Sequence, residues 1–300
     1  MKITAPMVKE LRERTGSGMM ECKKNLTEAN GDMELAIENM RKSGLAKADK
    51  KAGRVAAEGA IGIKASDDGK TVAMVEINSE TDFVVKSEDF KGFVDEVVAV
   101  VLTNDVKNVE QLSETVLANG ETVEITRRAL IAKVGENISL RRFEKYSNVD
   151  GGTACYLHGG KIAVIIETAK NDAELGKDIA MHVAAVNPLC VSDADVAPEV
   201  IEKEKEIISG RIKAEAEESG KAKPADIIEK MATGRIKKFL SEITLLGQKF
   251  IKDDKMTVEA LLKSKDNAVI RFTRFEVGEG IEKEEVDFAE EVRAQASASA

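Results

Sequence analysis

The chain has 300 residues, of which 43% are hydrophobic, 33% are charged and only 4% are aromatic. This apolar content is enough for two or three folded parts, and the composition favours helix over strand. The 54 acidic residues outnumber the 45 basic ones, and the net charge of −9 argues against a nucleic acid as the primary ligand.

The cysteines and the N-terminal residues indicate a cytoplasmic protein. Cys22, Cys155 and Cys190 are widely spaced, form no CxxC motif and fit reduced thiols. The chain opens on a charged amphipathic pattern without the apolar segment of a secretory signal. No run of about 18 apolar residues occurs, so we expect no membrane span.

Residues 1–44 contain three short helical patterns separated by glycines. Their ends are marked by residues that cap or stop helices: Thr4 and Gly16, then Asn30 and Gly31, then Asp32 and Gly44. Each pattern has one apolar stripe, so together they predict a compact three-helix module. The small and basic stretch 45–57 that follows favours a solvated linker.

Two adjacent methionines in the second helical pattern have different expected environments. Met19 lies on the apolar stripe with Cys22 and is expected in the core, whereas Met20 falls well off that stripe. An exposed Met20 is either an ordinary surface residue or a partner contact, because adaptable thioether side chains are over-used at protein contact surfaces.

From Gly59 the periodicity becomes that of β-strands. Two strand-like runs flank the turn signal Asp67-Asp68-Gly69, and an amphipathic helix is expected from about Ser87 to Leu102. Two helical patterns and a strand-like run follow, at 109–117, 123–134 and 137–144. The apolar side of the helix at 87–102 must cover a sheet.

The stretch 154–186 repeats the hairpin-then-helix order of 59–102. The core is therefore predicted to be two related α+β halves. Only the first copy has the tetrapeptide Thr81-Asp82-Phe83-Val84 between its strand and its helix. This difference marks the tetrapeptide as an addition to the shared architecture.

Between Pro198 and Ile243 the strand signals vanish and two charged helical patterns flank residues 219–224. Apolar residues at helical spacing predict an antiparallel helical hairpin. A helix near 258–265, a strand at 269–277 and an acidic helix near 284–292 complete the pattern. The predicted parts are a helical module with its linker (1–54), the first half of the core (55–145), the second half (146–194 and 244–280), the hairpin (195–243), and a C-terminal helix and tail (281–300).

The residues offer no recognisable catalytic, cofactor or metal site. GxGxxG, GxxxxGK[ST] and GxSxG motifs are absent. His182 lies on an apolar helical stripe and is expected to pack in the core, whereas His158 is expected in an exposed turn between strands. No second histidine or cysteine stands at metal-ligand spacing from His158. We therefore expect neither an enzyme nor a bound cofactor.

The tetrapeptide at 81–84 is predicted to be a loop with two possible roles. In one, Thr81 or Asp82 makes a local turn and Phe83 tucks under the next helix. In the other, Phe83 is an exposed anchor beside a carboxylate, a combination that fills a partner's pocket and disturbs its charges. The spacing of the residues leaves both roles open.

Four segments together resemble the bacterial elongation factor Ts family nearly end to end. They are the opening KELRERTGSGMMECKKNLTEANGDMELAIENMRKSG, then TDFV, AMHVAA and RFEVGEGIEK. The resemblance implies an α+β protein with a ubiquitin-associated-like (UBA-like) N-terminal module, a two-part core, an inserted coiled-coil hairpin and a C-terminal helix. It also implies a non-enzymatic exchange factor that binds elongation factor Tu in its GDP-bound and nucleotide-free forms.

The resemblance further implies roles for individual residues. Asp82 and Phe83 would intrude beside the Mg²⁺ site of the GTPase, and Thr81 and Val84 would shape their loop. Contacts with the partner would come from five more residues: Arg12, Met19 and Met20 toward its nucleotide domain, and His158 and Ile251 toward another of its domains. Direct nucleic-acid binding is not expected, and self-association occurs in some family members only.

The sequence is also compatible with two functions other than nucleotide exchange. One is a general adaptor whose three-helix module binds ubiquitin-like or ribosomal partners, with the tetrapeptide serving only in packing. The other is a metal-dependent hydrolase that uses Asp82 and neighbouring carboxylates, a poorer fit because no histidine or acidic cluster completes its site.

Overall fold

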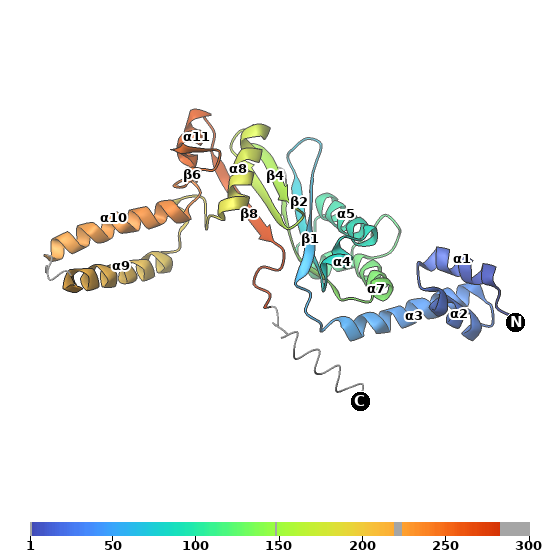
Figure 1. Cartoon of the computed structure of the whole chain (residues 1–300). Coiled ribbons are helices and arrows are strands. Elements are labelled where there is room, and N and C mark those ends of the chain that lie inside the picture. The colour runs from blue at the N-terminus through green and yellow to red at the C-terminus, as the bar shows by residue number, and fades with distance from the viewer. Residues whose placement is uncertain (1, 148, 219–223, 283–300) are drawn as a thin grey trace. The chain divides into compact units, whose positions relative to one another are not determined.

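The structure is a computed structural model that describes residues 2–147, 149–218 and 224–282. Helices alternate with small sheets along the chain, which confirms the mixed α and β class (Figure 1). Among the described residues, one compact unit contains 2–62, 75–143 and 276–282, and a second contains the rest. The helix predicted at 284–292 and the tail lie outside the described residues.

The first unit begins with the predicted three-helix module. Its helices are α1 (Ala5–Thr15), α2 (Met19–Glu28) and α3 (Met33–Lys51). Gly16 ends α1 in the left-handed conformation, and the Asp32 carboxylate accepts the Leu35 N–H at the start of α3, as the cap signals predict. The core of the module is formed by Leu11, Cys22, Leu26, Ala29, Ala36 and Met40.

The predicted end of α3 before Gly44 is wrong, and so is the linker predicted at 45–57 over its first part, 45–51; residues 52–55 follow the helix and are exposed. The helix continues through Gly44 to Lys51, and Ala48 is buried. Packing against α7 (Val123–Val134) explains the difference, because a Cβ atom at Gly44 would lie 3.1 Å from the Ala132 Cβ atom. A small residue here lets the two helices approach closely, so tertiary contact outweighs the low helix propensity of glycine.

The first sheet has the strand order β1–β2–β3, and helices lie between its second and third strands in the sequence. Its strands are β1 (Glu58–Ala65), β2 (Val72–Ser79) and β3 (Ile138–Tyr146). Ser87 caps α5 (Glu88–Thr103), whose apolar face is buried as predicted. The short helix α6 (Val109–Glu114) precedes α7. These elements match the strand and helix patterns of the sequence.

The second unit repeats the strand, strand, helix order. Strands β4 (Gly152–His158) and β5 (Ile162–Thr168) pair antiparallel, and the sheet order is β4–β5–β8 with β8 at Val269–Glu276. Helix α8 (Ala173–Val186) packs its apolar face on this sheet. Residues 169–172 connect β5 to α8 without a helix, so the tetrapeptide of the first copy has no counterpart, as predicted.

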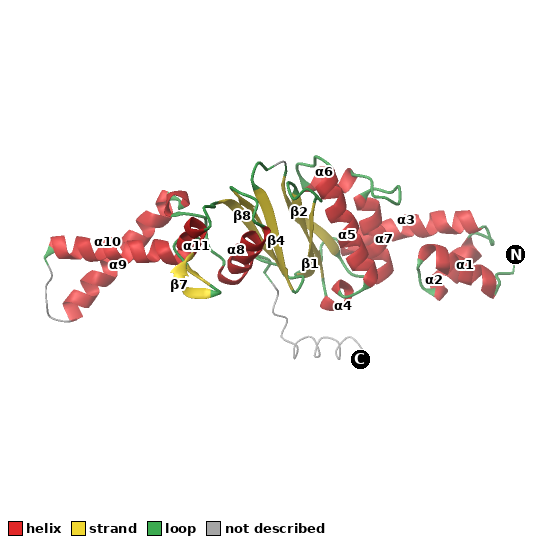
Figure 2. Cartoon of the chain, turned by 90° about the horizontal axis from the view of Figure 1, so that it is seen from above, coloured by secondary structure: helices red, strands yellow, loops and turns green. Residues whose placement is uncertain are grey.

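Two long helices of the second unit form the predicted helical pair, shown side by side in Figures 1 and 2. They are α9 (Pro198–Glu218) and α10 (Ala225–Ile243), preceded by a short 3₁₀ turn, η1 (Asp193–Asp195). Ile208, Ile212 and Ile236 are buried between them. The chain then forms a small sheet that the sequence patterns do not predict, β6 (Lys249–Phe250) with β7 (Asp253–Thr257), followed by α11 (Val258–Ser264).

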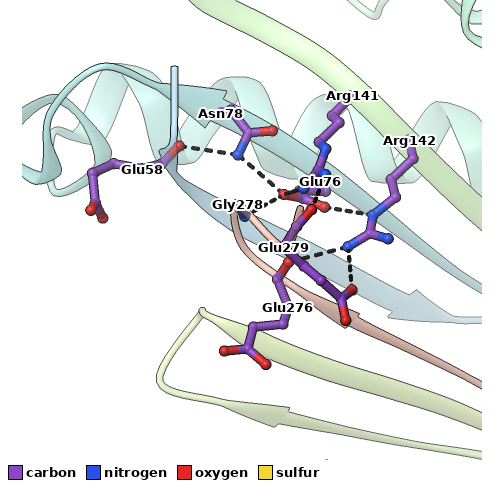
Figure 3. Close-up of polar contacts among 8 residues, drawn as sticks. All are labelled: Glu58, Glu76, Asn78, Arg141, Arg142, Glu276, Gly278 and Glu279. Atoms are coloured by element: carbon purple, nitrogen blue, oxygen red, sulfur yellow. Dashed lines mark hydrogen bonds and ion pairs between the residues drawn. The ribbon is translucent and has the colours of Figure 1, made fainter. Parts of the chain in front are cut away.

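A buried carboxylate joins the segment after β8 to the first sheet (Figure 3). Glu76 on β2 has a fully buried side chain, and its Oε1 atom accepts the Gly278 N–H at 2.8 Å. Arg141 and Arg142 on β3 donate to the two carboxylate oxygens at 2.8 Å and 2.6 Å. Asn78 adds a donor to Oε1 at 3.1 Å. One acidic side chain therefore connects three separate segments of the first unit.

Candidate functional site

The tetrapeptide at 81–84 forms part of a one-turn helix rather than a loop. Helix α4 (Asp82–Val85) follows β2 directly, and the Lys86 N–H donates to the Asp82 carbonyl at 3.1 Å. Ser87 then bonds back to the Val84 carbonyl through its N–H and its hydroxyl, at 3.0 Å and 2.7 Å. The predicted loop is thus wrong in detail, because four residues are too few to show helical periodicity.

Phe83 is presented to solvent. Its side chain is 81% exposed, and no residue of α4 is buried. The alternative in which Phe83 tucks under the following helix is therefore wrong. A large aromatic side chain at the tip of a short turn is the kind of anchor that fills a pocket on a partner protein.

Asp82 lies beside this aromatic ring with a carboxylate that is only weakly engaged. Lys86 donates to it at 2.6 Å, and the same ammonium lies 5.9 Å from the centroid of the Phe83 ring. The Lys86 side chain is largely open to water and that of Asp82 about half open, and an ion pair in such a position contributes little stability. Asp82 can therefore leave Lys86 for a new partner at small cost.

Thr81 is fixed by a carboxylate from a distant part of the sequence. Its N–H donates to Glu136 Oε2 at 3.0 Å and its hydroxyl donates to Oε1 at 2.7 Å. The Ser79 hydroxyl adds a third bond to Oε2 at 3.1 Å. Glu136 lies 55 residues after Thr81, and no motif or spacing in the sequence connects the two.

Three residues expected to contact a partner are brought together on the N-terminal module. Arg12, Met19 and Met20 line one groove of about 380 Å³ between α1 and α2. Met20 is 77% exposed, as predicted from its position off the stripe. The core position predicted for Met19 is wrong, since it is 62% exposed. Met19 is the first residue of α2, and side chains lean toward the helix N-terminus, so this one extends past the core.

The second unit carries the other two residues of the predicted contact set. His158 ends β4 in an exposed position, followed by Gly159 and Gly160 in the left-handed region, which confirms the predicted turn. Its Nδ1 atom lies 3.2 Å from the Tyr156 hydroxyl. Ile251 is 49% exposed at the turn between β6 and β7.

Comparison with known proteins decides the family. The model of a family described as elongation factor TS matches residues 80–279. The elongation factor Ts of Methylococcus capsulatus is 61% identical over 299 residues, which cover 100% of both chains. Those of Thioalkalivibrio sulfidiphilus and Legionella pneumophila are 58% and 55% identical, each over 98% or more of both chains. The chain belongs to the elongation factor Ts family.

The family match includes the tetrapeptide, His158 and Ile251 but not the N-terminal groove. It begins at Glu80, directly before Thr81, and ends at Glu279, in the segment held by Arg142. The N-terminal groove lies before the matched range, but the full-length elongation factor Ts relatives cover it too. None of the described helices combines the length and hydropathy that a membrane span needs.

His182, in this member of the elongation factor Ts family, is buried as predicted and holds the turn that carries Ile251. The Ile251 N–H donates to His182 Nδ1 at 3.2 Å, which leaves the ring proton on Nε2. Nε2 then donates to Gln248 Oε1 at 2.9 Å, and Gln248 Nε2 donates to the Glu242 carbonyl at 2.8 Å. This chain of bonds needs a neutral imidazole, because a protonated ring cannot accept the Ile251 N–H.

Acid is expected to weaken the fold through His182. Burial lowers the pKa of His182 below its usual 6.5 and outweighs the opposing hydrogen bond to Gln248. Below pH 6.5 the unfolded chain therefore binds a proton that the folded chain does not. The free energy of unfolding consequently decreases as the pH is lowered, by at most about 1.4 kcal/mol per pH unit. Urea unfolding from pH 7.5 to 5 should show this loss in the wild type and a smaller one in His182→Gln. His158→Gln is the matched control, and an equal acid dependence in His182→Gln would contradict the assignment.

Proposed function

We propose that this protein is a guanine-nucleotide exchange factor for elongation factor Tu, which it binds in the GDP-bound and nucleotide-free states. Membership of the elongation factor Ts family supports the proposal. The structural observation that carries it is the exposed Phe83 beside Asp82 on α4. The activity is not enzymatic, since it forms and breaks only non-covalent contacts, and it belongs to translation in the cytoplasm.

The proposed mechanism uses α4 to loosen the nucleotide site of the partner. Translational GTPases hold GDP through a phosphate-binding loop and a Mg²⁺ ion that bridges phosphate oxygens. Phe83 would insert as a wedge beside this site, and the Asp82 carboxylate would exchange Lys86 for groups that hold the Mg²⁺ shell. Weakening the metal and the phosphate contacts releases GDP.

The other parts of the chain would hold the partner while α4 acts. The groove with Arg12, Met19 and Met20 offers one contact, and the turns with His158 and Ile251 offer others. Several linked contacts keep a complex together even when one of them is strained. We further propose that the three-helix module is UBA-like and that α9 and α10 act as a coiled-coil hairpin. The domains would have the limits predicted in the sequence analysis.

Thermodynamic linkage sets a limit on this function. If the factor weakens GDP binding, GDP must weaken factor binding by the same ratio. The protein therefore speeds exchange without favouring GTP in net terms. The direction of exchange comes from the relative concentrations of GTP and GDP and from later capture of the GTP form.

Release of a fluorescent GDP analogue from elongation factor Tu tests the proposal. The wild-type protein should accelerate release strongly, and the variant Asp82→Ala/Phe83→Ala should lose most of that acceleration. Both proteins should give the same far-UV circular dichroism, because neither side chain is buried. If the folded wild type does not accelerate release, nucleotide exchange is rejected and the adaptor function becomes the better-supported one. Turnover without any GTPase present would instead support a hydrolase.

A further inference from the structure

Apolar burial holds helix α4 only in part, because Phe83 is exposed and Val84 and Val85 are half-buried. None of its residues is buried, and Thr81, which precedes it, makes no side-chain cap to the helix. Isolated single turns of helix are not stable in water, because nucleation costs more than one turn of hydrogen bonds returns. Some other contact must therefore fix the direction in which α4 presents Phe83.

The Glu136 carboxylate provides that contact. It accepts the N–H and the hydroxyl of Thr81 and the hydroxyl of Ser79, so both of its oxygens are used. The two bonds from Thr81 fix the backbone at the residue from which α4 begins.

Glu136 is itself held on both sides in the sequence. Gly135 ends α7 in the left-handed conformation, with its N–H bonded to the Ile131 carbonyl at 2.8 Å. The Asn137 N–H donates to Glu80 Oε1 at 2.6 Å, and its side-chain amide donates to the Arg54 carbonyl at 2.7 Å. The carboxylate is therefore a rigid attachment point and not a mobile surface group.

We infer that Glu136 is a positioning residue for nucleotide exchange, which acts through Thr81 by fixing the direction of α4. This inference rests on the proposed function. Because other parts of the chain would hold the partner, loss of Glu136 lowers the maximal rate of GDP release more than it raises the half-saturating concentration. The role depends on the reach and the acceptor atoms of the side chain and not on its charge.

Three substitutions at Glu136 separate reach from charge. Glu136→Gln keeps the length: its amide oxygen can accept from Thr81 N–H and Ser79, while its NH₂ group donates to the Thr81 hydroxyl. Glu136→Asp keeps the charge but is one methylene shorter, so it reaches neither donor of Thr81. Glu136→Ala removes both. Glu88→Ala is the matched control, because Glu88 is an exposed acid on α5 that is paired only with Lys91 in the described structure.

The experiment titrates each variant against elongation factor Tu that carries the fluorescent GDP analogue. Glu136→Ala and Glu136→Asp should lower the maximal rate roughly tenfold, with a half-saturating concentration within about twofold of the wild type. This is less than the roughly 100-fold that a misplacement of about 1 Å can cost, because Phe83 and Asp82 are still present. Glu136→Gln and Glu88→Ala should stay within about twofold in both quantities. A wild-type rate for Glu136→Ala, or equal losses for Glu136→Gln and Glu136→Ala, would overturn the inference.

Amide hydrogen exchange gives a readout that does not depend on GDP release. Glu136→Ala should accelerate exchange of the amides of residues 81–87, whereas Glu88→Ala should leave Thr81 and Asp82 unchanged. Unchanged exchange at 81–87 in Glu136→Ala overturns the inference even if the wild type proves active. If the wild type fails to accelerate GDP release, the proposed function fails. Faster amide hydrogen exchange at 81–87 in Glu136→Ala would then show that Glu136 orders α4 but has no part in nucleotide exchange.

Discussion

Phe83→Ala is expected to slow GDP release from elongation factor Tu by roughly 30-fold at saturating factor, the effect of removing an anchor worth about 2 kcal/mol. Asp82→Ala should slow it less. The aromatic ring is 81% exposed in the free protein, with only the Lys86 ammonium near its face, so it would gain most of its contacts in the complex. Asp82 must first give up Lys86 at 2.6 Å, so part of its new interaction replaces an old one. Stopped-flow release of a fluorescent GDP analogue measures both variants.

Lys86→Met is the informative control for this ordering. It removes the cation that lies near both side chains while keeping the length of the stem. If Asp82 acts as a free carboxylate in the complex, Lys86→Met should release GDP at least as fast as the wild type. Equal slowing by Phe83→Ala and Asp82→Ala, or a larger loss from Asp82→Ala, would refute the ordering.

Elements with a local cause were predictable from the sequence. Asp32 and Ser87 accept backbone N–H groups at the starts of α3 and α5, and both helix starts follow from residue type and position alone. The apolar stripe of α5 likewise required burial on one face. By contrast, α3 runs past Gly44 because a partner helix approaches there, and the partner is remote in sequence. A glycine therefore does not end a helix where a neighbouring helix packs closely against it.

The candidate site was predictable in its residues but not in its geometry. The tetrapeptide stood out because the second strand-strand-helix copy lacks it. Whether Phe83 packs or protrudes depends on what holds Thr81, and that group is Glu136, 55 residues away. Pairs at such separation leave no periodic signal in a single sequence. Elements of two to five residues, such as β6 and β7, are missed for a different reason, because they are too short to show a periodic pattern.

The sequence patterns also did not predict the buried carboxylate of Glu76. Among the substitutions considered, its removal should lower the free energy of unfolding most. Strand β2 is buried throughout, yet it includes this acidic residue (Figure 3). Burial alone would raise the pKa of Glu76, but the donors Gly278, Arg141, Arg142 and Asn78 outweigh it and hold the pKa below its usual 4.5. The group is therefore ionised and paired throughout the neutral range.

Glu76→Ala is expected to lower the free energy of unfolding by about 3 kcal/mol at pH 7, because removal of one partner leaves Arg141 and Arg142 without their shared acceptor. The Gly278 N–H loses its acceptor as well, so the segment after β8 should detach first. Urea unfolding followed by far-UV circular dichroism measures the loss, with Glu58→Ala on the neighbouring strand β1 as the control.

The pH dependence of this contribution has a definite sign. A carboxylate whose pKa is lowered on folding stabilises the protein fully above the unfolded value of about 4.5, and the stabilisation is lost as the pH falls through the lower folded value. The difference in unfolding free energy between the wild type and Glu76→Gln should therefore be constant from pH 7 to about 5 and shrink below 4.5. A difference that stays constant down to pH 3 would mean that Glu76 is not held in its charged form. This loss is separable from that of His182, which begins about two pH units higher, below 6.5.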